Sequence, residues 1–104
     1  MKTITKLGLK QSIDQKQDML LIDVLPQESF DKKHIQNAIN IPVKDNENFV
    51  KDVEAKAKSK NQLIVVYCAS TRCDASKKAA EQLEKAGFTN VQCYEEGLEG
   101  WFDT

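Results

Sequence analysis

The chain has 104 residues, of which 40% are hydrophobic and 30% are charged, and its formal net charge is −1. This length predicts one domain, spanning residues 1–104, with a core of ordinary size. The small net charge, with both signs spread along the chain, argues against electrostatic binding to nucleic acid or to anionic membranes. No apolar run approaches the roughly 18 residues that a membrane-spanning helix needs.

Short apolar runs alternate with helical patterns along the whole chain. We expect strands within residues 3–4, 19–24, 38–42, 63–67 and 91–94. We expect helices or helical turns within residues 9–13, 28–32, 46–58, 75–86 and 98–102. Strict alternation with short connections predicts an α/β fold of three layers, with about five mostly parallel strands and helices on both faces.

The chain is organised around a buried strand at residues 63–67, followed by Cys68, a polar loop and the helix that begins near Ala75. In open parallel sheets, ligands bind beyond the carboxyl ends of the strands. Cys68 therefore occupies a position where chemistry is expected. The alternative is a buried structural cysteine, which is common for this residue type.

The motifs of the chain resemble those of a single-domain rhodanese-like protein, in order and at similar spacing. They are residues 21–24 (LIDV), 34–35 (HI), 38–42 (AINIP), 66–68 (VYC), 79–80 (AA) with Leu83, 87–88 (GF), and 97–98 (GL) with Trp101. The second cysteine, Cys73, matches a variant subgroup with two cysteines in the loop. The loop departs from the usual family pattern because it lacks a glycine and is two residues longer.

The resemblance implies a five-stranded parallel sheet and a catalytic Cys68 that carries sulfane sulfur as a persulfide. The implied activity is sulfur transfer from a small donor such as thiosulfate, or from a persulfide protein, to a thiol, cyanide or a protein acceptor, with no cofactor and no metal. The implied substrate-binding loop consists of Ala69, Ser70, Thr71, Arg72, Cys73 and Asp74.

Such chemistry needs a thiolate, and a free thiol has a pKa of about 8.5. Backbone N–H groups of the loop and the start of the following helix can lower that value. We therefore expect the Cys68 sulfur to be reachable, ionised and surrounded by amides. Arg72 is either a further anion ligand or a solvated loop charge.

Several residues have competing interpretations. Cys73 is an inert loop residue, a resolving thiol that forms a disulfide with Cys68, or a relay for the sulfur. Burial in a strand is favoured for Cys93. Structural roles are favoured for His34, which holds its turn, for Asp23, which caps a turn, and for Trp101, which covers the core.

Other functions remain as alternatives. A phosphatase or arsenate reductase needs an arginine six positions after the cysteine, where this chain has Asp74. A thiol redox protein would use Cys68 and Cys73. A zinc site from the cysteines and His34 matches none of the usual spacings, so no metal is expected. A non-catalytic rhodanese-like binding module is the fourth alternative. Three cysteines without a secretory signal predict a reducing compartment, and we expect the cytoplasm.

Overall fold

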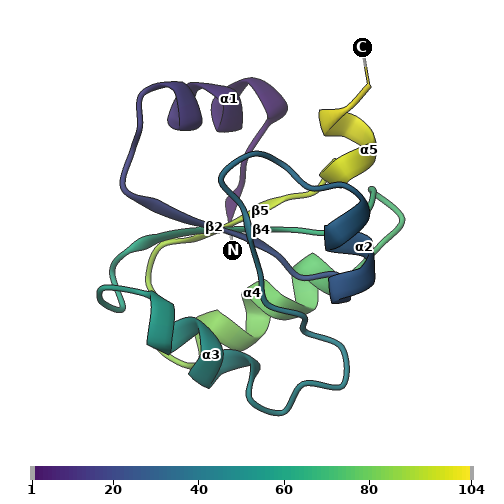
Figure 1. Cartoon of the computed structure of the whole chain (residues 1–104). Helices are drawn as coiled ribbons and strands as arrows, with labels where there is room; N and C mark the ends of the chain where they lie inside the picture. Colours follow the sequence, from purple (N-terminus) through teal and green to yellow (C-terminus); the bar gives the residue numbers. More distant parts are fainter. Residues whose placement is uncertain (1, 104) are drawn as a thin grey trace.

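The computed structural model describes residues 2–103, in which strands and helices alternate from end to end (Figure 1). The strands are β1 (Lys2–Thr3), β2 (Met19–Asp23), β3 (Ile39–Asn40), β4 (Leu63–Tyr67) and β5 (Val91–Tyr94). The helices are α1 (Lys6–Asp14), α2 (Gln27–Lys32), α3 (Phe49–Lys56), α4 (Ala75–Lys85) and α5 (Gly97–Trp101). Among the described residues, no helix combines the length and the apolar character needed to cross a bilayer.

The five strands form one sheet in the order β1-β5-β4-β2-β3, and every neighbouring pair is parallel. This confirms the predicted α/β class. β4 is central because its residues are apolar on both faces, and Ile64 to Tyr67 are all fully buried. Asp23, Tyr67 and Tyr94 are directly paired across three strands, so these strands end at the same edge. Cys68 follows β4 at that edge.

Helices cover both faces of the sheet, α1 and α5 on one side and α3 and α4 on the other (Figure 1). Side chains alternate between the faces along each strand. Val66 and Cys68 therefore lie in the core under α3 and α4, while Tyr67 faces α1 and α5. Each fully buried large side chain, such as that of Phe49 in α3, stabilises the fold by about 1.5–3 kcal/mol.

Some predicted boundaries were wrong by a few residues, for local reasons. α1 begins at Lys6 because the Thr5 hydroxyl accepts the Gly8 N–H at 3.0 Å and caps the helix. α3 begins at Phe49, because the Asn46 side chain accepts the Asn48 N–H at 3.1 Å and forms a turn instead of a first helical turn. The strand expected at 38–42 is limited to Ile39–Asn40.

The predicted end of α4 is confirmed. Gly87 has a φ of +98°, which is the left-handed conformation of a glycine that ends a helix. The chain then turns back, and the Phe88 N–H donates to the Leu83 carbonyl at 3.1 Å. This turn directs β5 alongside β4, and so it helps to position the residues around Cys68.

Candidate active site

Cys68 lies at the carboxyl end of β4, as predicted, but its side chain is enclosed. Only 1% of the residue is exposed. Burial raises the pKa of the Cys68 thiol, and a hydrogen bond to Cys73 raises it further. The expectation of a reachable, ionised sulfur at this position is therefore not what this conformation presents: Cys68 is a buried, protonated thiol.

The thiol hydrogen of Cys68 has several acceptors within reach. The Cys73 carbonyl oxygen lies 3.3 Å from Cys68 Sγ, and Ser76 Oγ lies 3.4 Å away. The Cys73 sulfur is a third acceptor. A thiol hydrogen with this choice of acceptors favours the neutral form of Cys68.

Cys73 has the opposite character. It is half-buried, and its sulfur faces the Cys68 thiol and the backbone N–H groups of Ala75 and Ala69. Burial alone would raise the pKa of Cys73, but these hydrogen bonds outweigh burial, and the pKa lies below its ordinary value. The sulfur that is both partly accessible and inclined to ionise is therefore that of Cys73.

The loop amides do not encircle Cys68 as expected. The Arg72 N–H donates to Ser70 Oγ at 3.3 Å, and the Cys73 N–H donates to the Ser70 carbonyl at 3.1 Å. These two bonds close a turn over Ser70 and direct both donors away from Cys68. The backbone N–H that remains directed at the Cys68 sulfur is that of Ser76, in the first turn of α4.

Ser76 connects two buried thiols. Its hydroxyl oxygen accepts hydrogen bonds from Cys68 at 3.4 Å and from Cys93 at 3.2 Å, and only 1% of Ser76 is exposed. Cys93 is fully buried, as predicted, in β5 beside β4. Because Cys93 donates to Ser76, the serine hydroxyl hydrogen is free to donate to the Cys68 sulfur whenever that sulfur becomes negative.

Helix α5 holds the first part of the loop in place. The Leu98 N–H donates to the Cys68 carbonyl at 3.0 Å, and the Glu99 N–H donates to the Ala69 carbonyl at 2.9 Å. Gly97 has a φ of +63°, and a Cβ there would overlap the Cys68 carbonyl oxygen and lie 2.9 Å from the Ser70 nitrogen. Glycine is required at this position, which the sequence indicated only as one of several motif residues.

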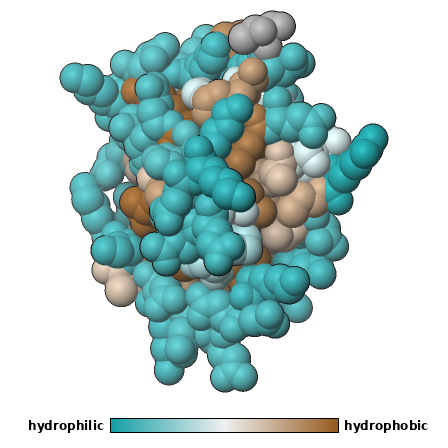
Figure 2. Space-filling model, turned by 45° about the vertical axis from the view of Figure 1, so that its right-hand side comes forward, coloured by the Kyte–Doolittle hydropathy of each residue, from teal (hydrophilic) through white to brown (hydrophobic). Residues whose placement is uncertain are grey.

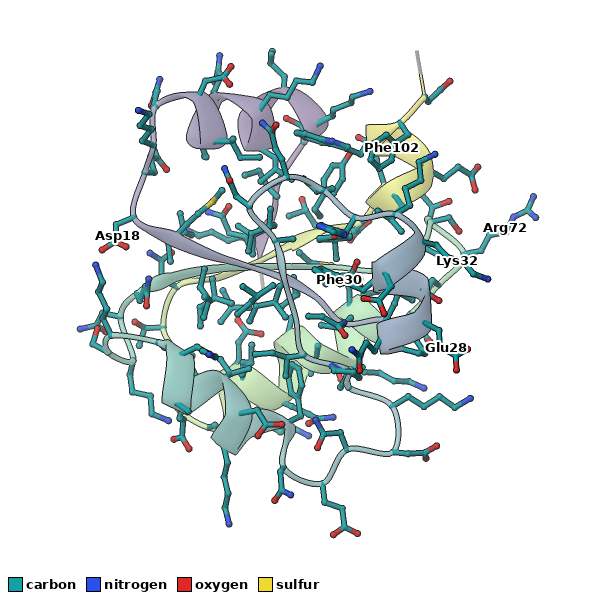
Figure 3. The ribbon with its side chains drawn as sticks, in the orientation of Figure 1. Asp18, Glu28, Phe30, Lys32, Arg72 and Phe102 are labelled. Atoms are coloured by element: carbon teal, nitrogen blue, oxygen red, sulfur yellow. The ribbon has the colours of Figure 1, made fainter. Side chains whose placement is uncertain are left out.

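The remaining loop residues lie towards solvent. Arg72 is exposed and its side chain projects away from the body of the protein (Figure 3). Thr71 and Asp74 are exposed as well, and Asp74 pairs with Lys78 at 3.5 Å. Of the two predicted alternatives for Arg72, an anion ligand or a solvated loop charge, this conformation matches the solvated loop charge.

Two hollows flank the loop. One, of about 460 Å³, lies beside Asp74 and Ala75, and its wall contains Lys44, Asp45 and Lys78. The other, of about 140 Å³, lies between Ser70 and Thr71 and the acidic residues of the α5 region, which are Glu96, Glu99 and Asp103. The face turned forward in Figure 2 is mostly hydrophilic, with apolar residues in a band across it.

Three further residues have the structural contacts that the sequence favoured. Asp23 Oδ1 accepts the Leu25 N–H at 2.9 Å and caps the turn after β2. His34 stacks on Phe30 with ring centroids 3.9 Å apart, and its Nδ1 lies 2.8 Å from the Phe30 carbonyl oxygen. Trp101 packs edge-on against Tyr94 over the core. Within residues 2–103, no three His, Cys, Asp or Glu side chains are grouped as metal ligands.

These features define a three-layer parallel α/β domain whose candidate site is a pair of thiols in the loop between β4 and α4. The chain belongs to the rhodanese-like family, because the family model described as Rhodanese-like domain matches residues 6–104. The predicted family and fold are thereby confirmed.

Two curated relatives come from Escherichia coli (strain K12). Thiosulfate sulfurtransferase PspE is 40% identical over 72 residues, which cover 68% of this chain and 64% of that protein. Uncharacterized protein YibN is 35% identical over 101 residues, which cover 96% of this chain and 66% of that protein. The chain therefore spans just under two thirds of the length of these relatives.

Solved structures show the same fold. BH2092 protein from Bacillus halodurans has a TM-score of 0.81 and 27% identity, covering 96% of this chain and 70% of that one. A rhodanese-like domain protein from Staphylococcus aureus has a TM-score of 0.76 and 27% identity, covering 99% and 93%. Family and relatives together support a role in sulfur transfer.

Proposed function

We propose that this chain is a sulfurtransferase that carries sulfane sulfur as a persulfide on Cys68. The observation that carries the proposal is the position of Cys68, at the carboxyl end of the central strand and against the first turn of α4, in a chain of the rhodanese-like family. The similarity to a thiosulfate sulfurtransferase supports thiosulfate as a donor. The acceptor is a thiol, cyanide or a protein, in the cytoplasm.

Two donors on α4 support a negative sulfur at Cys68. The Ser76 N–H faces Cys68 Sγ, and the Ser76 hydroxyl lies 3.4 Å away with its own hydrogen available. Hydrogen bonds to a charged group are worth about 1.5–3 kcal/mol each. A persulfide that is ionised at neutral pH would therefore be held at a position where the parent thiol is neutral.

Release of the sulfur balances without any redox partner. An acceptor thiolate attacks the outer sulfur of the persulfide, the bond between the two sulfurs breaks, and the Cys68 sulfur leaves with the electron pair. A proton from solvent restores the Cys68 thiol, and the acceptor leaves as a persulfide anion. The hydrogen-bond acceptors around Cys68 then stabilise the neutral thiol again.

The experiment is peptide mapping after sulfur loading. The protein is incubated with thiosulfate, alkylated and cleaved with trypsin, which cuts after Lys60, Arg72, Lys77 and Lys85. The cut after Arg72 separates Cys68, in residues 61–72, from Cys73, in residues 73–77. We expect the peptide 61–72 to carry one additional sulfur at equilibrium.

The matched control is the double variant Cys68→Ser, Cys73→Ser, which retains Cys93 and should take up no sulfur. Wild-type protein that takes no sulfur from thiosulfate or from a small thiol persulfide would refute the function. So would a double variant that is loaded as fully as wild type.

A second function has one observation in its favour, which is the hydrogen bond between the Cys68 and Cys73 thiols. A thiol redox protein would oxidise this pair to a disulfide, giving two electrons and two protons to a disulfide or peroxide substrate. Mild oxidation would then join peptides 61–72 and 73–77 and remove two hydrogens from the intact mass, without sulfur uptake.

A further inference from the structure

The enclosure of Cys68 raises a question about access, because a donor must bring its sulfur within bonding distance of a thiol. Cys68 is 1% exposed, and hydrogen bonds from α5 hold the backbone on its carboxyl-terminal side. The half-buried thiol beside it is Cys73. In this conformation a donor meets Cys73 first.

Assuming the function proposed above, we propose that Cys73 is a second catalytic thiol, which receives sulfur from the donor and passes it to Cys68 for storage. Three observations carry this assignment: Cys68 Sγ lies 3.3 Å from the Cys73 carbonyl oxygen, Cys73 is the more accessible of the two residues, and backbone N–H groups of Ala69 and Ala75 face its sulfur.

The loading step balances with thiosulfate as donor. The Cys73 thiolate attacks the outer sulfur of thiosulfate, a bond forms between the two sulfurs, and the bond to the sulfite group breaks. Sulfite leaves with the electron pair of that bond, and Cys73 becomes a persulfide anion. The step needs no proton. The lowered pKa of Cys73 supplies the thiolate for this attack.

The transfer step uses the contact that already exists. The Cys68 sulfur attacks the outer sulfur of the Cys73 persulfide, the bond between that sulfur and Cys73 Sγ breaks, and the persulfide now belongs to Cys68. The proton of the Cys68 thiol passes to Cys73 Sγ along the hydrogen bond between them. The number of sulfane sulfurs and the net charge are unchanged, so no oxidant or reductant is needed.

The surroundings differ in a way that fits these two roles. A hollow of about 460 Å³ opens beside Asp74 and Ala75, which follow Cys73 in the chain. Its wall contains Lys44 and Lys78 but also Asp45 and Asp74, so it offers space for a small donor without a net positive charge. Cys68, by contrast, is in the apolar core with Val66 and Ala79, where a stored persulfide is shielded from other thiols.

The test follows the additional sulfur with time, using rapid quenching and the same tryptic peptides. In wild type we expect it first on peptide 73–77 and then on peptide 61–72. In Cys68→Ala it should remain on 73–77, and loading should be slower than in wild type because the Cys68 thiol helps to lower the pKa of Cys73. In Cys73→Ser, loading of Cys68 should slow by about tenfold or more, because Cys68 is 1% exposed and burial raises its pKa, which reduces its thiolate fraction.

Each other result has a defined meaning. Wild-type loading rates in Cys73→Ser, or no sulfur on Cys73 in Cys68→Ala, would overturn the relay and leave the proposed function intact. Peptides 61–72 and 73–77 joined by a disulfide, with hydrosulfide released, would overturn the relay in favour of a resolving thiol. Wild type that takes no sulfur at all would refute the function itself. Cys73→Ala serves as a second variant at this position and should load as slowly as Cys73→Ser. Far-ultraviolet circular dichroism of every variant checks that slow loading is not caused by unfolding.

Discussion

The two halves of the loop between β4 and α4 are held in different ways. Residues 68–70 are fixed from outside the loop, by N–H donors of α5 at 3.0 and 2.9 Å and by the close approach of Gly97. Residues 71–74 are held mainly by the turn over Ser70 and by the exposed pair of Asp74 and Lys78. The first half contains an enclosed thiol and the second half a half-buried one.

This difference shows that one short loop can hold one thiol enclosed and another accessible, which is the arrangement that the proposed relay needs. A segment fixed by non-local hydrogen bonds opens only at a high free-energy cost, whereas an exposed turn with local bonds opens easily. A thiol in the fixed half is protected, and a thiol in the exposed half meets partners. The following predictions test this contrast, from the largest expected effect to the smallest.

The largest effect should come from Gly97→Ala, which affects the fixed half. The new Cβ would overlap the Cys68 carbonyl oxygen, and the residue would have an unfavourable positive φ. We expect a loss of about 2–4 kcal/mol in the free energy of unfolding, measured by urea denaturation.

The matched control is Gly87→Ala. Gly87 also has a positive φ, +98°, but a Cβ added there would meet nothing within 4 Å beyond its two chain neighbours. This variant should lose only about 1–2 kcal/mol, the cost of the left-handed backbone alone. Equal losses at both glycines would contradict the claim that α5 holds the loop through close contact.

Ser76→Ala should have the next largest effect. It leaves two buried thiols, those of Cys68 and Cys93, without their shared acceptor. We expect a loss of about 1–2 kcal/mol in unfolding free energy. The variant should also raise the pKa of Cys68, because the Ser76 hydroxyl favours the thiolate.

The measurement for Ser76→Ala is urea denaturation, together with the pH dependence of Cys68 alkylation. Ser12→Ala is the control, since Ser12 is also buried but lies in α1 on the opposite side of the sheet. A Cys68 pH profile that does not move in Ser76→Ala would show that the serine has no influence on the sulfur.

Alkylation rates compare the two halves of the loop directly. Cys73 is more accessible and has the lower pKa, while burial raises that of Cys68. At pH 7, iodoacetamide should modify peptide 73–77 at least about tenfold faster than peptide 61–72. With rising pH the thiolate fraction of Cys73 should reach its maximum first. Faster labelling of Cys68 at pH 7 would reverse the assignment of the two roles.

The smallest effect should come from Arg72→Gln in the exposed half. The Arg72 side chain projects into solvent, so its substitution removes few contacts with the rest of the protein (Figure 3). We expect a change within about 0.5 kcal/mol in unfolding free energy. Sulfur uptake from thiosulfate should change by less than about threefold. Loss of most uptake at low salt would instead identify Arg72 as an anion ligand.

Stability should also depend on pH in a defined direction. Burial raises the pKa values of Cys68 and Cys93, and raises that of Tyr94 to about 12. The unfolded chain releases these protons at lower pH than the folded one. The stabilisation from these three groups is therefore complete below the ordinary thiol pKa and is lost as pH rises towards 12, whereas the lowered pKa of Cys73 acts in the opposite direction only below the ordinary thiol pKa. Thermal unfolding between pH 9 and 11 measures the loss, and a constant or rising Tm over that range would contradict it.

The sequence alone predicted the architecture, because its signals are local. A run of β-branched residues such as Ile64 and Val65 predicts a buried strand, Gly87 marks the end of a helix, and a parallel strand that ends at Cys68 predicts a site at that edge. The family motifs are local patterns as well, and they predicted the family that the comparison confirmed.

Only the tertiary structure decided which sulfur is enclosed and which is accessible. That outcome depends on contacts between distant segments: α5 binds the backbone after Cys68, and Ser76 of α4 bridges to Cys93 of β5. It also depends on Ser70 accepting the amides that were expected to face Cys68. Burial and hydrogen-bond choice are set by all neighbours in space at once. A pattern of residues along the chain predicts where a thiol lies but not which donors reach it.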